Sequence, residues 1–184
     1  MKSAKNVHGE IYKALGTFLL SSISFLLSFF APSGALSNFL NIKTIPCLGL
    51  GLLSGILYIF WIALAREFYG KGHGSVVAIL TVSFILLGGP WYGVTNPVYF
   101  GVFGFLSFLA MGILTDFLNG GIGSVSCLVI NWIAFSCFRN FSPSPLWLAL
   151  LVLLMSFVSG TVFDYLAKLL VNRVLHSSAS KIER

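Results

Sequence analysis

The chain has 184 residues, of which 57% are hydrophobic and 9% are charged, and its mean hydropathy is +0.95. Because about a quarter of the residues of a soluble domain are charged, this composition excludes an ordinary soluble domain and indicates an integral membrane protein. The net charge of +6 does not indicate a nucleic-acid-binding protein, because the basic residues are spread over tails and loops rather than gathered on one face.

Six apolar segments follow one another along the chain, each bounded by glycine, proline, asparagine or a charged residue. They cover residues 11–31, 45–65, 75–89, 98–118, 122–138 and 146–170. A helix that crosses a bilayer needs about 20 residues. The third segment is the shortest of the six and falls below this length. We therefore expect an all-α polytopic membrane protein, a compact bundle of six transmembrane helices in which residues 1–184 form a single membrane domain.

The basic residues indicate an orientation for this bundle. With a cytoplasmic N-terminus, nine of the 11 lysines and arginines lie on the inner side, and only Lys43 and Arg139 lie outside. This asymmetry follows the positive-inside rule, and an even number of crossings returns the C-terminus to the cytoplasm. We expect a protein of the cell membrane with both termini inside.

The N-terminus has an alternative interpretation as a signal peptide, because Lys2 and Lys5 precede an apolar run. The run is long, however, and "FFAPSGALS" offers no clean small-x-small cleavage site. We expect the segment to be retained as the first crossing.

The first crossing carries hydroxyl side chains at steps of four, three and four residues, which places them on one helical face. They are Thr17, Ser21, Ser24 and Ser28. Small hydroxylated residues let helices approach closely in a membrane. The stripe is either a docking face for another membrane subunit or an internal packing face, and the sequence favours neither.

The connection between the third and fourth crossings reads "LLGGPWYGVTNPVYF" and lies outside in this topology. Its Trp91, Tyr92 and Asn96 lie at an outer depth comparable to that of Asn131 and Trp132 in the fifth crossing. Aromatic walls with a few amides suit an uncharged or weakly charged ring compound. The same aromatics also suit an interfacial belt, and Asn131 has either a neighbouring helix or a ligand as its expected partner.

Two acidic residues, Asp116 and Asp164, lie within apolar segments, toward their cytoplasmic ends. A charge in the membrane is costly and often marks a proton or cation site. Coupling-ion sites usually lie near the midplane, however. We therefore favour helix capping or pairing with Arg66 or Lys168 over an ion site.

Other residue types predict no catalytic or metal centre. The chain has no Walker A loop, G-x-S-x-G elbow, H-E-x-x-H helix or paired catalytic carboxylates, so we expect no enzyme and no cofactor. The histidines and cysteines show no ligand spacing, and we interpret the cysteines as small apolar residues. These residues are His8, His73, His176, Cys47, Cys127 and Cys137.

Three stretches, "GLLSGILYIFW", "ILLGGP" and "FLAMGILTDFLNGGIGSVS", together with six crossings in about 180 residues, resemble the substrate-binding S components of energy-coupling factor transporters. They lie within residues 51–126 and are similar to the branch associated with uptake of thiamine precursors and cobalamin. The resemblance implies a vitamin-capture subunit that binds ligand under its outer loops and works with a membrane coupling subunit and two cytoplasmic ATPases. The first helix of that family presents an alanine-x-x-x-alanine motif, whereas Thr17 and Ser21 occupy that spacing here.

Two other functions remain open. "GILTDFLNGGIGS" also resembles rod-shape-determining membrane proteins, which implies a scaffold of the cell-envelope machinery that binds no ligand. A small ion-coupled transporter that uses Asp116 and Asp164 is the third interpretation. A scaffold has little use for the outer aromatic loop, so we expect the S-component function.

Overall fold

The computed structural model describes residues 2–31, 48–88, 100–139 and 145–182. Within these ranges the chain is helical and has no strand, which confirms the prediction of an all-α protein. The α-helices are α1 (Lys2–Phe30), α3 (Leu48–Ser54), α4 (Phe60–Tyr69), α5 (His73–Gly88), α7 (Phe105–Phe117), α8 (Gly120–Arg139) and α9 (Leu146–Ile182). Two π-helical turns, Gly55–Ile59 and Phe100–Gly104, connect α3 to α4 and lead into α7.

Each of the six predicted segments overlaps one helical segment of the structure, if α3, the first π-helical turn and α4 are taken as one continuous segment. The main differences lie in α1 and α9, which extend into polar sequence, to Lys2 and to Ile182. Hydropathy marks the apolar part of a helix and not its end. No glycine or proline follows Gly160, so nothing in the sequence stops α9 after its apolar stretch.

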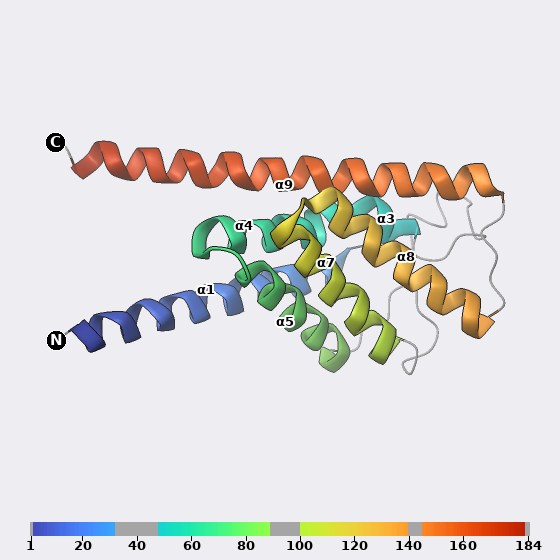
Figure 1. Cartoon of the computed structure of the whole chain (residues 1–184), viewed down its shortest axis with the longest axis horizontal. Coiled ribbons are helices and arrows are strands. Elements are labelled where there is room, and N and C mark those ends of the chain that lie inside the picture. The colour runs from blue at the N-terminus through green and yellow to red at the C-terminus, as the bar shows by residue number, and fades with distance from the viewer. Residues whose placement is uncertain (1, 32–47, 89–99, 140–144, 183–184) are drawn as a thin grey trace.

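The long helix α9 lies along one side of the bundle, and the shorter helices pack beside it (Figure 1). Both chain termini lie toward the same end of the molecule (Figure 1). Two tight connections, residues 70–72 and 118–119, face this end (Figure 1). Gly70 and Gly72 have φ angles of 98° and 94°, a conformation that favours glycine, and this explains the "YGKGHG" sequence between α4 and α5.

The main core lies between α4, α5 and α7 and the π-helical turn Gly55–Ile59. Ile59, Val77 and Met111 are fully buried there. The ring of Tyr58 meets the ring of Phe108 edge to face, with centroids 4.8 Å apart. A second cluster joins α8 to α9 through Leu128, Trp132, Ala149 and Val152. Each helix therefore buries one face in a shared interior.

Glycines allow α8 to approach α9 closely. A Cβ atom on Gly160 would lie 2.4 Å from the carbonyl oxygen of Gly120, and one on Gly120 would lie 2.7 Å from the carbonyl oxygen of Gly160. Backbone atoms cannot move aside as a flexible side chain can. The "NGGIG" sequence at the start of α8 thus sets the separation of the two helices.

The π-helical turn Gly55–Ile59 and the residues just before it expose backbone carbonyl groups that side chains satisfy. Ser24 donates a hydrogen bond of 2.6 Å to the carbonyl of Leu57, and Ser159 donates one of 3.0 Å to the carbonyl of Leu52. The indole of Trp61 donates to the carbonyl of Ile56. In an apolar environment such groups need partners, and here α1 and α9 supply two of them.

Four helical segments in the described part of the chain are long and apolar enough to cross a membrane: Gly9–Phe30, Gly51–Tyr69, Gly120–Phe138 and Leu146–Leu175. His73–Gly88 and Gly101–Phe117 are apolar but shorter. Many large apolar side chains face outward, among them Phe18, Leu87, Val102, Trp147 and Leu154. An exposed apolar surface of this kind is typical of a protein that contacts lipid or a partner.

Candidate functional site

A buried ion pair joins α4 to α9. The Nη2 atom of Arg66 lies 2.6 Å from Oδ1 of Asp164, and the two side chains are only 8% and 4% exposed. The sequence predicts Arg66 or Lys168 as partners of the acidic residues, and the structure brings both to Asp164. Lys168 contacts Oδ2 of Asp164 at 3.3 Å from one turn further along α9.

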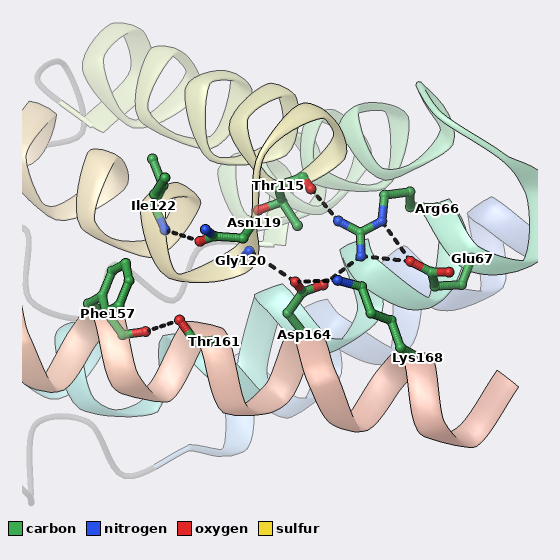
Figure 2. A network of polar contacts seen from close by, with 10 residues as sticks. All are labelled: Arg66, Glu67, Thr115, Asn119, Gly120, Ile122, Phe157, Thr161, Asp164 and Lys168. Carbon is green, nitrogen blue, oxygen red and sulfur yellow. Dashed lines mark hydrogen bonds and ion pairs between the residues drawn. The ribbon is translucent and has the colours of Figure 1, made fainter. Parts of the chain in front are cut away.

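The ion pair belongs to a network that joins four helices (Figure 2). Arg66 also contacts Oε1 of Glu67 at 2.7 Å and donates a hydrogen bond to the carbonyl oxygen of Thr115 near the end of α7. The backbone N–H of Gly120, at the start of α8, donates to Asp164 at 3.4 Å. The cations Arg66 and Lys168 balance the carboxylates Glu67 and Asp164. The network therefore leaves no net formal charge between the four helices.

Asp116 lies in a separate contact at the start of α5. Its Oδ2 accepts hydrogen bonds from the backbone N–H of Ser75 at 2.7 Å and from the Ser75 hydroxyl at 2.6 Å. A carboxylate at a helix N-terminus satisfies a free N–H group and interacts well with the helix dipole. Oδ1 of Asp116 and the Thr115 hydroxyl are buried and have no hydrogen-bond partner within the described residues.

The hydroxyl stripe of α1 faces the interior of the bundle. Thr17, Ser21, Ser24 and Ser28 are all buried, and Ser24 reaches across to the π-helical turn. The other three donate to carbonyl groups of α1 itself. Burial of these side chains inside the bundle agrees with the interpretation of the stripe as an internal packing face. A partner subunit would have to displace α1 to reach these side chains.

Asn131 and Trp132 point to different surroundings, although they are adjacent in sequence. Nδ2 of Asn131 donates a hydrogen bond of 2.8 Å to the carbonyl of Cys127, one turn earlier in its own helix. This partner lies within α8 itself, in addition to the neighbouring helix and the ligand that the sequence leaves open as partners of Asn131. Trp132 packs with Leu128, Ala149 and Val152.

A chain of hydroxyl groups beside Asn131 was not predicted from the sequence. The hydroxyls of Ser54 and Ser124 are hydrogen-bonded, and Ser124 contacts Ser156 at 2.7 Å. They come from α3, α8 and α9 and are buried. A serine in an apolar segment is a weak signal, and only the packing of the three helices brings these three together.

Asn131 and the three serines line a cavity of about 10 Å³, together with Gly51, Cys127 and Leu128. This volume is near the lower limit for one water molecule, so the cavity is too small for a vitamin-sized ligand. A ligand that involves Asn131 would have to bind nearer to the ends of α3, α8 and α9 that face away from the chain termini.

The remaining predicted ligand contacts, Trp91, Tyr92 and Asn96, lie outside the described residues. His73 lies at the start of α5, where Nδ1 is 3.2 Å from the carbonyl oxygen of Gly70. No group of three or more His, Cys, Asp or Glu side chains suited to a metal ion occurs within the part of the chain that the structure describes.

Comparisons of the chain with protein-family models, with curated proteins and with solved structures find no match in any of the three.

Proposed function

We propose that the chain is an integral membrane protein that crosses the bilayer six times, with both termini in the cytoplasm. Four long apolar helices, two shorter ones and an outward-facing apolar surface support the membrane embedding, and the distribution of lysine and arginine supports the orientation. In this orientation the connections 70–72 and 118–119 face inward. Segments 32–47, 89–99 and 140–144 then connect helix ends on the outer side.

Within this topology the protein serves as the substrate-specificity subunit of an energy-coupling factor importer and captures a vitamin or vitamin precursor from outside. The observation that carries the proposal is the asymmetry of the bundle. The inner half has short connections and a buried, charge-neutral network around Arg66 and Asp164. The outer half receives three longer connections, one of which contains "GGPWYGVTNP".

The ligand in this proposal stacks on Trp91 or Tyr92 and hydrogen-bonds to Asn96 or Asn131. Trp132 supports the site from the α8–α9 interface. Aromatic stacking with a few amide hydrogen bonds suits an uncharged or weakly charged heterocycle. Transport of the ligand then requires a membrane coupling subunit and a pair of cytoplasmic ATPases.

Mass spectrometry of small molecules that co-purify with the detergent-extracted protein tests this function. We expect one heterocyclic compound in near-stoichiometric amount, and we expect the Trp91→Ala/Asn131→Ala double variant to lose it. Trp147→Ala is the matched control, because Trp147 lies at the start of α9 and is 65% exposed. Absence of any bound compound from the native chain, together with co-purification of cell-envelope proteins, would favour the scaffold instead.

A second candidate function rests on Asp116. Its buried Oδ1 has no hydrogen-bond partner among the described residues, and neither has the buried hydroxyl of Thr115. Buried acidic groups without a full set of partners are typical of proton or cation sites in membrane proteins. An ion-coupled transporter would use this carboxylate, and neutralisation of Asp116 separates the two functions.

A further inference from the structure

An apolar groove of about 540 Å³ lies between α1, α9 and the segment that contains the first π-helical turn and α4. Among the residues that the structure describes, its lining consists of Leu27, Ile56, Phe60, Trp61, Phe163, Leu166, Leu169 and Leu170, with Arg173 as the only charged residue. The Phe60 ring lies edge to face with Trp61 and Phe163, at centroid distances of 5.1 and 6.3 Å. Aromatic and aliphatic side chains therefore form the walls of the groove.

Arg173 supplies a positive charge to the groove. The residue is exposed and has no hydrogen bond or ion pair with any other residue that the structure describes. Lys168, the other basic residue nearby on α9, contacts Asp164 instead. Arg173 lies five positions after Lys168, which places their side chains about 140° apart around the helix. The guanidinium of Arg173 is thus available to an anionic group from outside the chain.

The dimensions of the groove fit one leaflet of a bilayer. Phe163 and Arg173 are ten residues apart on α9, a rise of about 15 Å and half of a hydrocarbon core of about 30 Å. Ala63 and Leu64 of α4 form one buried cluster with Ala167 and Val171 of α9, so Arg173 lies toward the end of α4 that leads into the turn 70–72. In the proposed orientation this level is the cytoplasmic interface.

The chemistry of the groove suits a hydrocarbon chain. Eight of the nine described residues that line its volume of about 540 Å³ are apolar, and they offer methylene groups an environment away from water. The one charged residue, Arg173, lies ten residues beyond Phe163 on α9, at the other end of the lining stretch of that helix. An acyl chain with an anionic headgroup matches this arrangement of apolar walls and a terminal positive charge.

We propose that this groove binds the acyl chain of an anionic phospholipid of the cytoplasmic leaflet, whose phosphate pairs with Arg173. Guanidinium and phosphate form strong, charge-assisted hydrogen bonds, and basic residues at this interface favour anionic over zwitterionic lipids. The inference rests on the membrane embedding and orientation proposed above and is independent of vitamin capture.

Fluorescence quenching by brominated lipids tests the proposal, because Trp61 lines the groove. A reporter chain keeps Trp61 and replaces Trp91, Trp132 and Trp147 with Phe, and a second reporter keeps Trp147 alone. Each is reconstituted in phosphatidylcholine vesicles that contain a small fraction of brominated phosphatidylglycerol or brominated phosphatidylcholine. Circular dichroism checks that both reporters are folded, and native mass spectrometry of the unmodified chain measures retained lipid independently.

We expect the phosphatidylglycerol to associate at Trp61 about fivefold more strongly than phosphatidylcholine, and Arg173→Gln to abolish this preference. Arg173→Lys retains a preference. Lys71→Gln, which removes the same charge from the turn after α4, leaves it unchanged. Native mass spectrometry should show retained phosphatidylglycerol that Arg173→Gln reduces.

Equal quenching of Trp61 by the two lipids, or a preference that persists in Arg173→Gln, overturns the proposal. Quenching of Trp147 without quenching of Trp61 also overturns it, because a partner helix or a second copy then covers the groove. If neither tryptophan is quenched, the membrane embedding fails as well, so this outcome separates failure of the lipid site from failure of the proposed topology.

Discussion

Arg66 and Asp164 are 98 residues apart in the sequence, yet Nη2 and Oδ1 lie 2.6 Å apart in the interior of the bundle. Through this pair and its neighbours, α4 and α9 are tied to the end of α7 and the start of α8. The charged groups neutralise one another where the surrounding helices are apolar. This pairing explains how the acidic residue Asp164 is tolerated in a helix that is proposed to cross the membrane.

Arg66→Met should destabilise the protein by about 3–5 kcal/mol, because it leaves the buried carboxylate of Asp164 with only Lys168 as a cationic partner. The double variant Arg66→Met/Asp164→Leu should recover much of this loss, since it leaves no unpaired charge. Equilibrium unfolding in mixed micelles measures both. Glu67→Gln is the control, with an expected change below about 1 kcal/mol, because the Glu67 side chain is 30% exposed. Equal stability of the single and double variants would argue against charge burial as the cause.

Gly160→Ala should destabilise the protein by about 1–3 kcal/mol, because the new Cβ meets the backbone of Gly120 and forces α8 and α9 apart. Gly9→Ala is the matched control, since a Cβ at Gly9 contacts nothing within 4 Å. Alanine also favours the helix by about 0.5–1 kcal/mol over glycine, so this variant should be unchanged or slightly more stable. Thermal unfolding in detergent distinguishes the two, and similar melting temperatures would contradict the close approach.

Ser24→Ala should cost about 1 kcal/mol, because the carbonyl of Leu57 in the π-helical turn loses its donor from α1. Ser22 donates only to the carbonyl of Phe18 in α1, so Ser22→Ala should change the stability by less than about 0.5 kcal/mol. The free energy of unfolding of both variants provides the measurement. A larger loss for Ser22→Ala would show that the hydroxyl stripe is not the packing face.

Asp116→Asn distinguishes the two proposed transport functions. An asparagine oxygen can still accept hydrogen bonds at the start of α5, so we expect a loss of stability of no more than about 2 kcal/mol. In a capture subunit, uptake of the co-purified ligand and its proton dependence should be unchanged. Abolished uptake with a folded protein would support the ion-coupled transporter, and Asp164→Asn extends the same measurement to the second carboxylate.

The positions of the helices could be predicted from the sequence, because each apolar segment is flanked by residues that stop or polarise a helix. The partners of Asp164 could also be named, since few basic residues lie near enough to the helix ends to reach it. The extent of α9 could not, because the predicted segment ends at Leu170, whereas the apolar stretch continues to Leu175 and the helix to Ile182 without a breaker.

The polar interior was predictable only in part. The spacing of Thr17, Ser21, Ser24 and Ser28 placed them on one face but gave no information on what that face contacts. The chain from Ser54 to Ser124 and Ser156 depends on the register of three helices, which no local pattern encodes. Likewise, Gly55 at the start of the π-helical turn packs closely against Ser159 and Phe163 of α9, a contact that no local pattern encodes.

Capture of a ligand from outside depends on the orientation of the bundle, and labelling of single cysteines in intact cells tests this orientation most directly. In a background without Cys47, Cys127 and Cys137, one variant carries Gly93→Cys in the connection 89–99, and the other carries Lys71→Cys in the turn 70–72. A membrane-impermeant maleimide should label position 93 in intact cells and position 71 only after permeabilisation. Labelling of position 71 in intact cells, with position 93 protected until permeabilisation, would contradict the proposed orientation and with it the capture of ligand from outside.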